Sequence, residues 1–152
     1  MRRRLWAGVQ YEEPTGRVGV TVVIASLGTA PLLRVSGELD HFGGSELCAV
    51  GREVLGANGR VLLLELSECT YIDSGGLGTL FGLLGDLGPD GVLGLIGVNQ
   101  DVCRILDIVG LPRLASLRLF ADAAEASDFL VVEYLVAGSR GPIEPSTGAG
   151  RR

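Results

Sequence analysis

Residues 61–84, VLLLELSECTYIDSGGLGTLFGLL, form the most informative stretch of this 152-residue chain. The first six are apolar apart from Glu65, which is typical of a central strand in a parallel sheet. Apolar residues then recur at a helical spacing, at Leu77, Leu80, Phe81 and Leu84. Between the two segments, positions 73–76 hold an acid, a serine and two glycines. The stretch therefore predicts a strand, a short turn and a helix.

The alternation of strand and helix continues on both sides of this stretch. Strands are predicted at 18–25, 31–35, 61–66, 91–98 and 117–120. Helices are predicted to open within SGELDHFGG (36–44), to follow Ser74, to cover 102–109, and to run from an Asp122 cap to about Val136. Such an alternation predicts an α/β fold with a mixed, largely parallel β-sheet and alternating helices. The predicted shared core consists of Leu62, Leu64, Leu66, Leu77, Leu80, Phe81, Val92, Ile96, Ile105 and Leu106.

Composition restricts the function. A net charge of −5 with a pI near 4.8 argues against a nucleic-acid-binding face. One histidine and three widely spaced cysteines supply too few ligands for a zinc site, so Cys48, Cys69 and Cys103 are expected to be small buried thiols. The N-terminal segment lacks the apolar core of a signal peptide, and no uncharged apolar run reaches the ~20 residues of a spanning helix. A cytoplasmic protein is expected.

The turn at 73–76 can be explained by structure alone or by function. Ser74 is a natural N-cap for the helix, and Asp73 lies where a negative charge favours the helix dipole. The glycines weaken this purely structural explanation, because each interior helical glycine costs about 1 kcal/mol relative to alanine. Four glycines recur in helical register, at Gly75, Gly78, Gly82 and Gly85. This stripe of exposed backbone predicts a contact surface.

Two kinds of enzyme fit the turn poorly. A serine hydrolase would use Ser74 with His41 and Asp40, but a nucleophile elbow requires a glycine where this chain has Ile72. Adjacent Asp40 and His41 also suit a catalytic relay badly. A dinucleotide-binding loop would need its third glycine where this chain has Phe81.

Three segments taken together resemble a STAS domain, most closely the bacterial anti-sigma factor antagonists. They are SGELDHFGGSEL (36–47), the stretch 61–84, and GVLGLIGVNQDVCRILDIVGL (91–111). The resemblance extends from about Val18 to Val136. It divides the chain into an N-terminal extension (1–17), a STAS domain (18–136) and a disordered C-terminal tail (137–152). Trp6 and Tyr11 in the extension are expected to form an extra β element or to pack on the sheet edge.

The resemblance assigns a role to each residue of the turn. Ser74, directly after Asp73, corresponds to the serine that is phosphorylated in this family. Many members carry a second hydroxyl at the next position, where this chain has Gly75 followed by Gly76. Asp40 corresponds to the aspartate of the G-E-L-D motif and is expected near Ser74, where it would help to bind the partner. Two further partner-binding candidates are Glu38 and His41.

The resemblance also implies a function without catalysis or a cofactor. The unphosphorylated protein would bind an anti-sigma factor, a serine kinase with a GHKL-type ATP site, and so free the sigma factor. Phosphorylation at Ser74 would end that binding, and a PP2C-type phosphatase would reverse it. The alternative is a STAS scaffold subunit of a stressosome or of a lipid-transport complex, without regulated phosphorylation.

Overall fold

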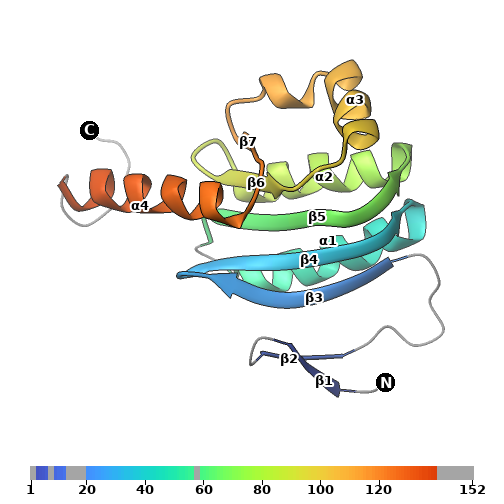
Figure 1. Ribbon diagram of the computed structural model, residues 1–152, viewed down its shortest axis with the longest axis horizontal. Helices are drawn as coiled ribbons and strands as arrows, with labels where there is room; N and C mark the ends of the chain where they lie inside the picture. Colours follow the sequence, from blue (N-terminus) through green and yellow to red (C-terminus); the bar gives the residue numbers. More distant parts are fainter. Residues whose placement is uncertain (1–2, 7–8, 13–19, 57–58, 140–152) are drawn as a thin grey trace.

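The predicted alternation produces one five-stranded sheet with helices on both faces (Figure 1). The computed structural model describes residues 3–6, 9–12, 20–56 and 59–139. The strands lie in the order β3-β4-β5-β6-β7, with β3 antiparallel to β4 and the other neighbours parallel. Their bounds are β3 Val20–Leu27, β4 Ala30–Leu39, β5 Val61–Ile72, β6 Val92–Ile96 and β7 Leu117–Phe120. The helices are α1 His41–Leu55, α2 Ser74–Leu87, α3 Gln100–Val109 and α4 Ala123–Ser139, with a 3-10 turn at Leu111–Arg113.

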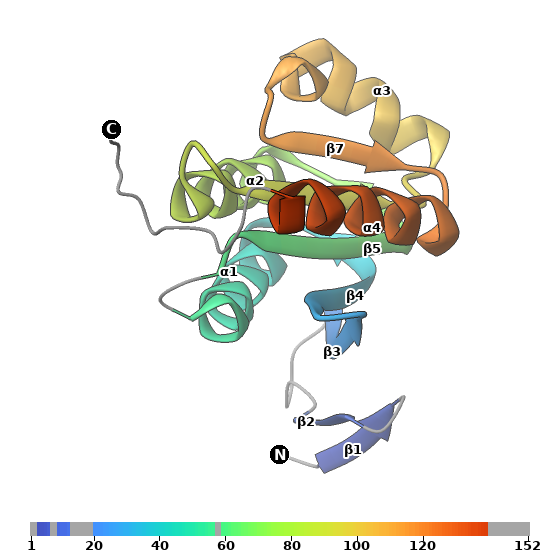
Figure 2. The same ribbon diagram turned by 90° about the vertical axis from the view of Figure 1, so that its left-hand side faces the viewer.

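The sheet separates two hydrophobic clusters. The larger cluster lies under α1, α2 and α3, where Leu62, Leu64 and Leu66 of β5 point toward the helices. The smaller cluster lies on the opposite face, where α4 covers Leu63 and Ile96 (Figure 2). Alternate residues of a strand face opposite sides of a sheet, so one apolar run can serve both clusters.

The predicted core is largely confirmed. Eight of its ten members are buried or packed against a cluster. Ile96 belongs to the cluster under α4, on the other face from Leu64, and Val92 is only partly buried. Phe81 is the error, because its side chain is 47% exposed. Phe81 lies outside the buried face of α2, so its side chain points toward solvent. That face is formed by Gly76, Thr79, Leu80, Leu83 and Leu87.

The second strand is longer than its sequence pattern indicates. The segment SGEL (36–39) was predicted to open a helix, but it belongs to β4 and pairs with β5 as far as Leu39 opposite Ile72. Two irregularities in this pairing, one on each side of the Ser36–Gly37 step, obscure the apolar alternation. Gly37 has a φ of 98°, which its lack of a Cβ allows.

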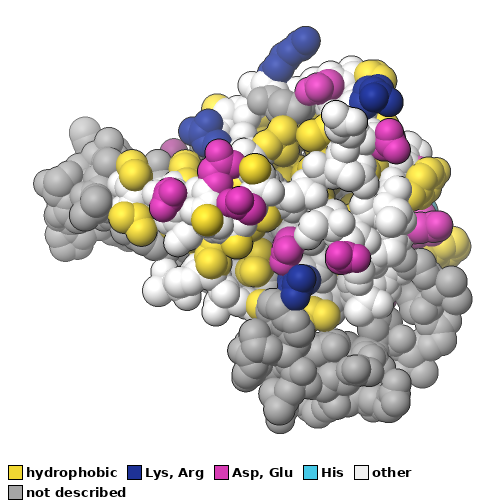
Figure 3. Space-filling view, in the orientation of Figure 1, with side chains coloured by type: hydrophobic (Ala, Val, Ile, Leu, Met, Phe, Trp, Pro, Cys, Tyr) yellow, Lys and Arg dark blue, Asp and Glu magenta, His cyan; other side chains and the backbone are white. Residues whose placement is uncertain are grey.

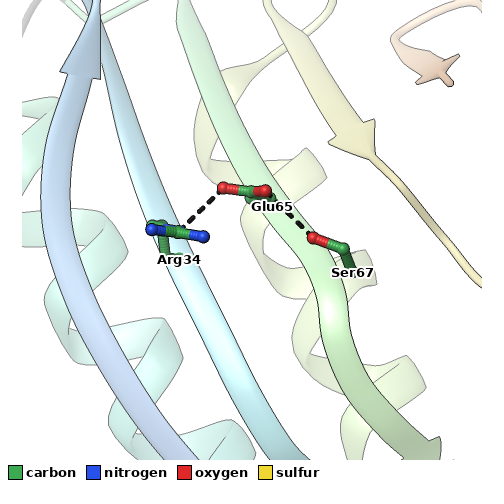
Figure 4. Close-up of polar contacts among 3 residues, drawn as sticks. All are labelled: Arg34, Glu65 and Ser67. Atoms are coloured by element: carbon green, nitrogen blue, oxygen red, sulfur yellow. Dashed lines mark hydrogen bonds and ion pairs between the residues drawn. The ribbon is translucent and has the colours of Figure 1, made fainter. Parts of the chain in front are cut away.

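The face opposite α1–α3 is only half covered, and this explains Glu65. Beyond the reach of α4, Glu65 of β5 lies beside Arg34 of β4 (Figure 4). Arg34 Nε is 2.8 Å from Glu65 Oε1, and Ser67 Oγ donates to Glu65 Oε2 at 2.9 Å. The one charge in the apolar first half of β5 is therefore paired on a solvent-facing surface. Acidic and hydrophobic side chains also lie side by side over α4 (Figure 3).

The three cysteines are free thiols. Cys69 is buried, and this burial raises the pKa of its thiol. Cys48 and Cys103 are only partly buried, so the expectation of buried thiols is confirmed fully for Cys69 alone.

Both ends of the chain add to the predicted domain. Trp6 and Tyr11 lie in an antiparallel hairpin of β1 (Arg3–Trp6) and β2 (Val9–Glu12), so the extra β element is present. At the other end α4 continues to Ser139, three residues past the predicted boundary, while the rest of the predicted tail lies outside the described residues. Among the described helices, none combines the length and apolar character needed to cross a membrane.

We expect Leu64→Ala to lower the free energy of unfolding by about 2–5 kcal/mol, because Leu64 is fully buried and the change leaves a cavity. Urea unfolding followed by far-UV circular dichroism measures this loss. Phe81→Ala is the matched control on the exposed side of α2, with an expected loss under about 1 kcal/mol. Equal losses in the two variants would contradict the placement of β5 at the centre of the core.

Candidate functional site

The candidate site lies where β4 and β5 end together. Their last residues, Leu39 and Ile72, pair with each other, so the turns that follow leave the sheet at the same edge. Each turn begins with an aspartate and leads at once into a helix. The two helix N-termini are thereby brought side by side.

Both helices are capped by aspartate. Asp40 Oδ1 accepts a hydrogen bond from the Gly43 N–H at 2.8 Å, and Asp73 Oδ1 accepts one from Gly76 N–H at 3.1 Å. The N-cap of α2 is therefore Asp73, and the prediction that Ser74 caps this helix is wrong. A carboxylate at the N-cap is also favoured by the positive end of the helix dipole. Ser74 becomes the first helical residue, and its side chain is exposed to solvent.

The two glycines after Ser74 allow α1 and α2 to meet. A Cβ placed on Gly75 would lie 2.6 Å from His41 Cα and 2.8 Å from His41 N. A Cβ on Gly76 would overlap the carbonyl oxygen of Leu39. Neighbouring main chain occupies the space in which a side chain would stand. The glycines are thus required by packing between helices and strand, which the sequence interpretation missed.

The predicted stripe of four glycines is divided by the same packing. Gly75 faces α1, and a Cβ on Gly82 would lie 3.9 Å from Cys48 Sγ of α1. Gly78 and Gly85 are exposed, with nothing within 4 Å of the position of a Cβ. The stripe is therefore two separate features, one internal and one open to solvent.

Two further contacts between α1 and α2 fix the spacing of the helices, and their residues were not singled out as site residues in the sequence. Thr79 is buried, and its Oγ1 donates to the Gly75 carbonyl oxygen at 3.2 Å. A Cβ on Gly44 would overlap the Thr79 hydroxyl. At the far ends of the same helices, Arg52 Nε donates to Asp86 Oδ2 at 2.7 Å. The repeated pattern D-x-x-G at 40–43 and 73–76 is the sequence signal for this paired arrangement.

The structure brings together six of the seven predicted site residues. These are Asp40, His41, Asp73, Ser74, Gly75 and Gly76. The seventh, Glu38, is exposed near the end of β4 and pairs with Tyr71 of β5. His41 is exposed, and its ring meets that of Phe42 edge to face at 5.4 Å between centroids. Phe42, which is 63% exposed, was not predicted.

The surface around Ser74 differs in shape from a substrate pocket. One cavity, of about 160 Å³, lies on the solvent-facing side of the sheet and is lined by residues such as Arg34 and Glu65. Another, of about 390 Å³, lies between α3 and the ends of β6 and β7. Ser74 lines neither of them. An exposed hydroxyl on an open surface beside an exposed aromatic ring suits contact with a macromolecule.

The helix contact leads to a stability test on two glycines of α2. We expect Gly75→Ala to destabilise the fold by about 1–3 kcal/mol, because the new methyl group meets the His41 backbone. Gly78→Ala, which adds the same methyl group in open space, is expected to stabilise the helix by about 0.5–1 kcal/mol. Thermal unfolding of both variants measures the difference. Stabilisation by Gly75→Ala would contradict the close contact between α1 and α2.

Comparison with known proteins identifies the fold. A sequence model of the family described as "Mlab, STAS domain" matches residues 22–119, well over half of the 152-residue chain. A putative anti-sigma factor antagonist from Thermotoga maritima superposes with a TM-score of 0.64 at 22% identity, covering 72% of this chain and 94% of that one. The phosphorylated form of the Bacillus cell fate determinant SpoIIAA gives a TM-score of 0.56 at 18% identity, covering 73% and 98%.

A structure from another setting has the same fold. A sulfate transporter family protein from Wolinella succinogenes superposes with a TM-score of 0.58 at 23% identity, covering 73% of this chain and 93% of that one. At such identities the solved structures establish the α/β architecture, and the sequence model establishes the family. This chain belongs to the STAS domain family.

Proposed function

We propose that the chain is a cytoplasmic anti-sigma factor antagonist that acts as a phospho-switch without catalysis of its own. In its unphosphorylated form it binds an anti-sigma factor, a serine kinase with a GHKL-type ATP site, and the sigma factor is released. Phosphorylation of Ser74 ends the binding, and a PP2C-type phosphatase restores it. The observation that carries this proposal is the exposed Ser74 at the start of α2, between the capping Asp73 and Gly75, which packs against the first turn of α1.

The charges around Ser74 explain how one phosphate would act. A phosphoserine adds about −1.5 to −2 charges at neutral pH. Asp73 and Asp40 hold two carboxylates at the same edge, each fixed there by its capping hydrogen bond. A partner docked on this edge would have to desolvate all three negative groups, which can cost several kcal/mol. Since about 1.4 kcal/mol is a factor of ten in affinity, one phosphate is enough to end a modest complex.

The fold itself is expected to tolerate the phosphate. Ser74 lies in the first turn of α2, where backbone N–H groups and the helix dipole favour an anion. Because Ser74 is exposed, the phosphate also displaces no packed side chain. The switch therefore acts on the interface rather than on folding. The structural likeness to proteins described as anti-sigma factor antagonists supports the same function.

A second candidate is a scaffold subunit without regulated phosphorylation, in a stressosome or a lipid-transport complex. The observation in its favour is the family match, whose description is Mlab rather than anti-sigma factor antagonist. The likeness to a sulfate transporter family protein adds to it. Under this alternative the same edge would bind a permanent partner, and the state of Ser74 would not change the affinity.

The phosphorylation test uses the cognate anti-sigma kinase with ATP. Wild type is expected to gain one phosphate, and Ser74→Ala none, by intact-protein and peptide mass spectrometry. Ser45→Ala is the matched control, since Ser45 is an exposed serine in the neighbouring helix α1. Ser74→Asp is expected to bind the kinase at least about tenfold more weakly than wild type. A phosphate mapped elsewhere, or equal affinity of wild type and Ser74→Asp, would favour the scaffold.

The role of Asp40 can be separated from its capping bond. Asp40→Asn keeps an oxygen that can accept from Gly43 N–H but removes the charge, so the melting temperature should change little. We expect weaker kinase binding in this variant, measured by titration calorimetry. Asp40→Ala should lose both the binding and about 1 kcal/mol of stability with the cap. If Asp40→Asn binds like wild type, Asp40 serves the helix only.

A further inference from the structure

The two edges of the sheet are protected to very different degrees. Strand β7 at one edge has four residues and carries Arg118 in an exposed position. Strand β3 at the other edge has eight residues, VTVVIASL, with neither a charge nor a proline. Proteins usually blunt a sheet edge with short strands, charges or prolines, because a bare edge pairs readily with another strand. By this criterion β7 is protected and β3 is not.

The outer side of β3 has a neighbour that does not pair with it. Within the described part of the chain, β3 pairs only with β4. The β1–β2 hairpin lies beyond β3, on the side away from β4, and both of its strands contact β3 (Figures 1 and 2). The hairpin nevertheless forms a separate two-stranded sheet. A two-stranded hairpin is marginally stable in water, so this cover can be removed at small cost.

We propose that the outer edge of β3 is a self-association surface, and that the β1–β2 hairpin covers it in the single chain. The partner is a second copy, whose β3 pairs antiparallel about a two-fold axis to continue the sheet through both chains. In antiparallel pairing about a two-fold axis, β3 of one copy lies beside β3 of the other. A charged residue near the centre of the strand would therefore lie close to the same charge in the other copy. No residue of β3 carries a charge. The strand is therefore compatible with its own copy.

The side chains of β3 suit such a junction. Thr21 and Ser26 are exposed near its two ends, and Val23 and Ile24 are half-buried at its centre. β-branched residues and small hydroxyls favour pairing between strands. The proposal is independent of Ser74, which is the first residue of α2 and takes no part in the pairing of β3.

The test weakens the hairpin within the full-length protein. Trp6 pairs with Val9 across a two-residue loop, so Arg4 and Tyr11 form the next hydrogen-bonded pair of the hairpin. Tyr11→Pro therefore removes a backbone donor from the hairpin. Wild type is expected to sediment with the 15.9 kDa mass of a single chain. Tyr11→Pro is expected to form dimers with a dissociation constant at least about tenfold lower than that of wild type. Hydrogen exchange should show added protection at β3 in these dimers.

Charges placed on β3 identify the surface. Adding Thr21→Lys and Ser26→Lys to Tyr11→Pro should restore the single chain, because both positions are exposed and the lysines would block strand addition. Ser45→Lys with Gln100→Lys adds the same charge on α1 and α3 and should leave the dimer intact. The self-association surface is overturned if Tyr11→Pro stays a single chain or if its dimer survives the lysines on β3. A wild type that already dimerises through β3 would overturn the covering role of the hairpin.

Discussion

The close approach of the first turns of α1 and α2 is the constraint on which the site depends. Main-chain atoms of His41 and Leu39 occupy the space in which side chains at 75 and 76 would stand. Each helix is capped by the aspartate that precedes it, so a backbone N–H group in the first turn of each helix has a partner within its own turn. The two first turns can therefore pack closely together. The parallel pairing of β4 with β5 delivers both turns to one edge. Strand register, helix caps and glycines thus act together to present one hydroxyl.

Under the proposed function, the two aspartates have two roles. A capping carboxylate is held in place by the helix, so its position at the edge where α2 begins is fixed. The effect of a phosphate on binding at a protein surface depends on the charges that are already fixed around it. Here the neighbouring charges belong to Asp40 and Asp73, which the fold also uses to cap α1 and α2. If the proposed function holds, the same atoms serve both structure and regulation.

The order of strands and helices and the location of the site could be predicted from the sequence, because both rest on local patterns. Apolar runs identified β5 and β6, and the acid–serine–glycine turn identified the start of α2. Details that depend on a neighbouring element could not be predicted. Whether Asp73 or Ser74 caps α2 depends on how the strand leaves the sheet, since both residue types are good caps. The exposure of Phe81 depends on which side of α2 rests on the sheet.

Gly75 also bears on how members of this family can diverge from one another. The atoms that a Cβ there would meet belong to the His41 main chain, so no change of side chain at position 41 can make room for it. A relative with a hydroxyl-bearing residue at this position must therefore hold its first two helices farther apart. Residue identity at one position and the spacing of two helices are expected to vary as a pair across lineages. A change from glycine to serine at this position would then be accompanied by a displacement of one helix relative to the other, although it looks conservative in an alignment.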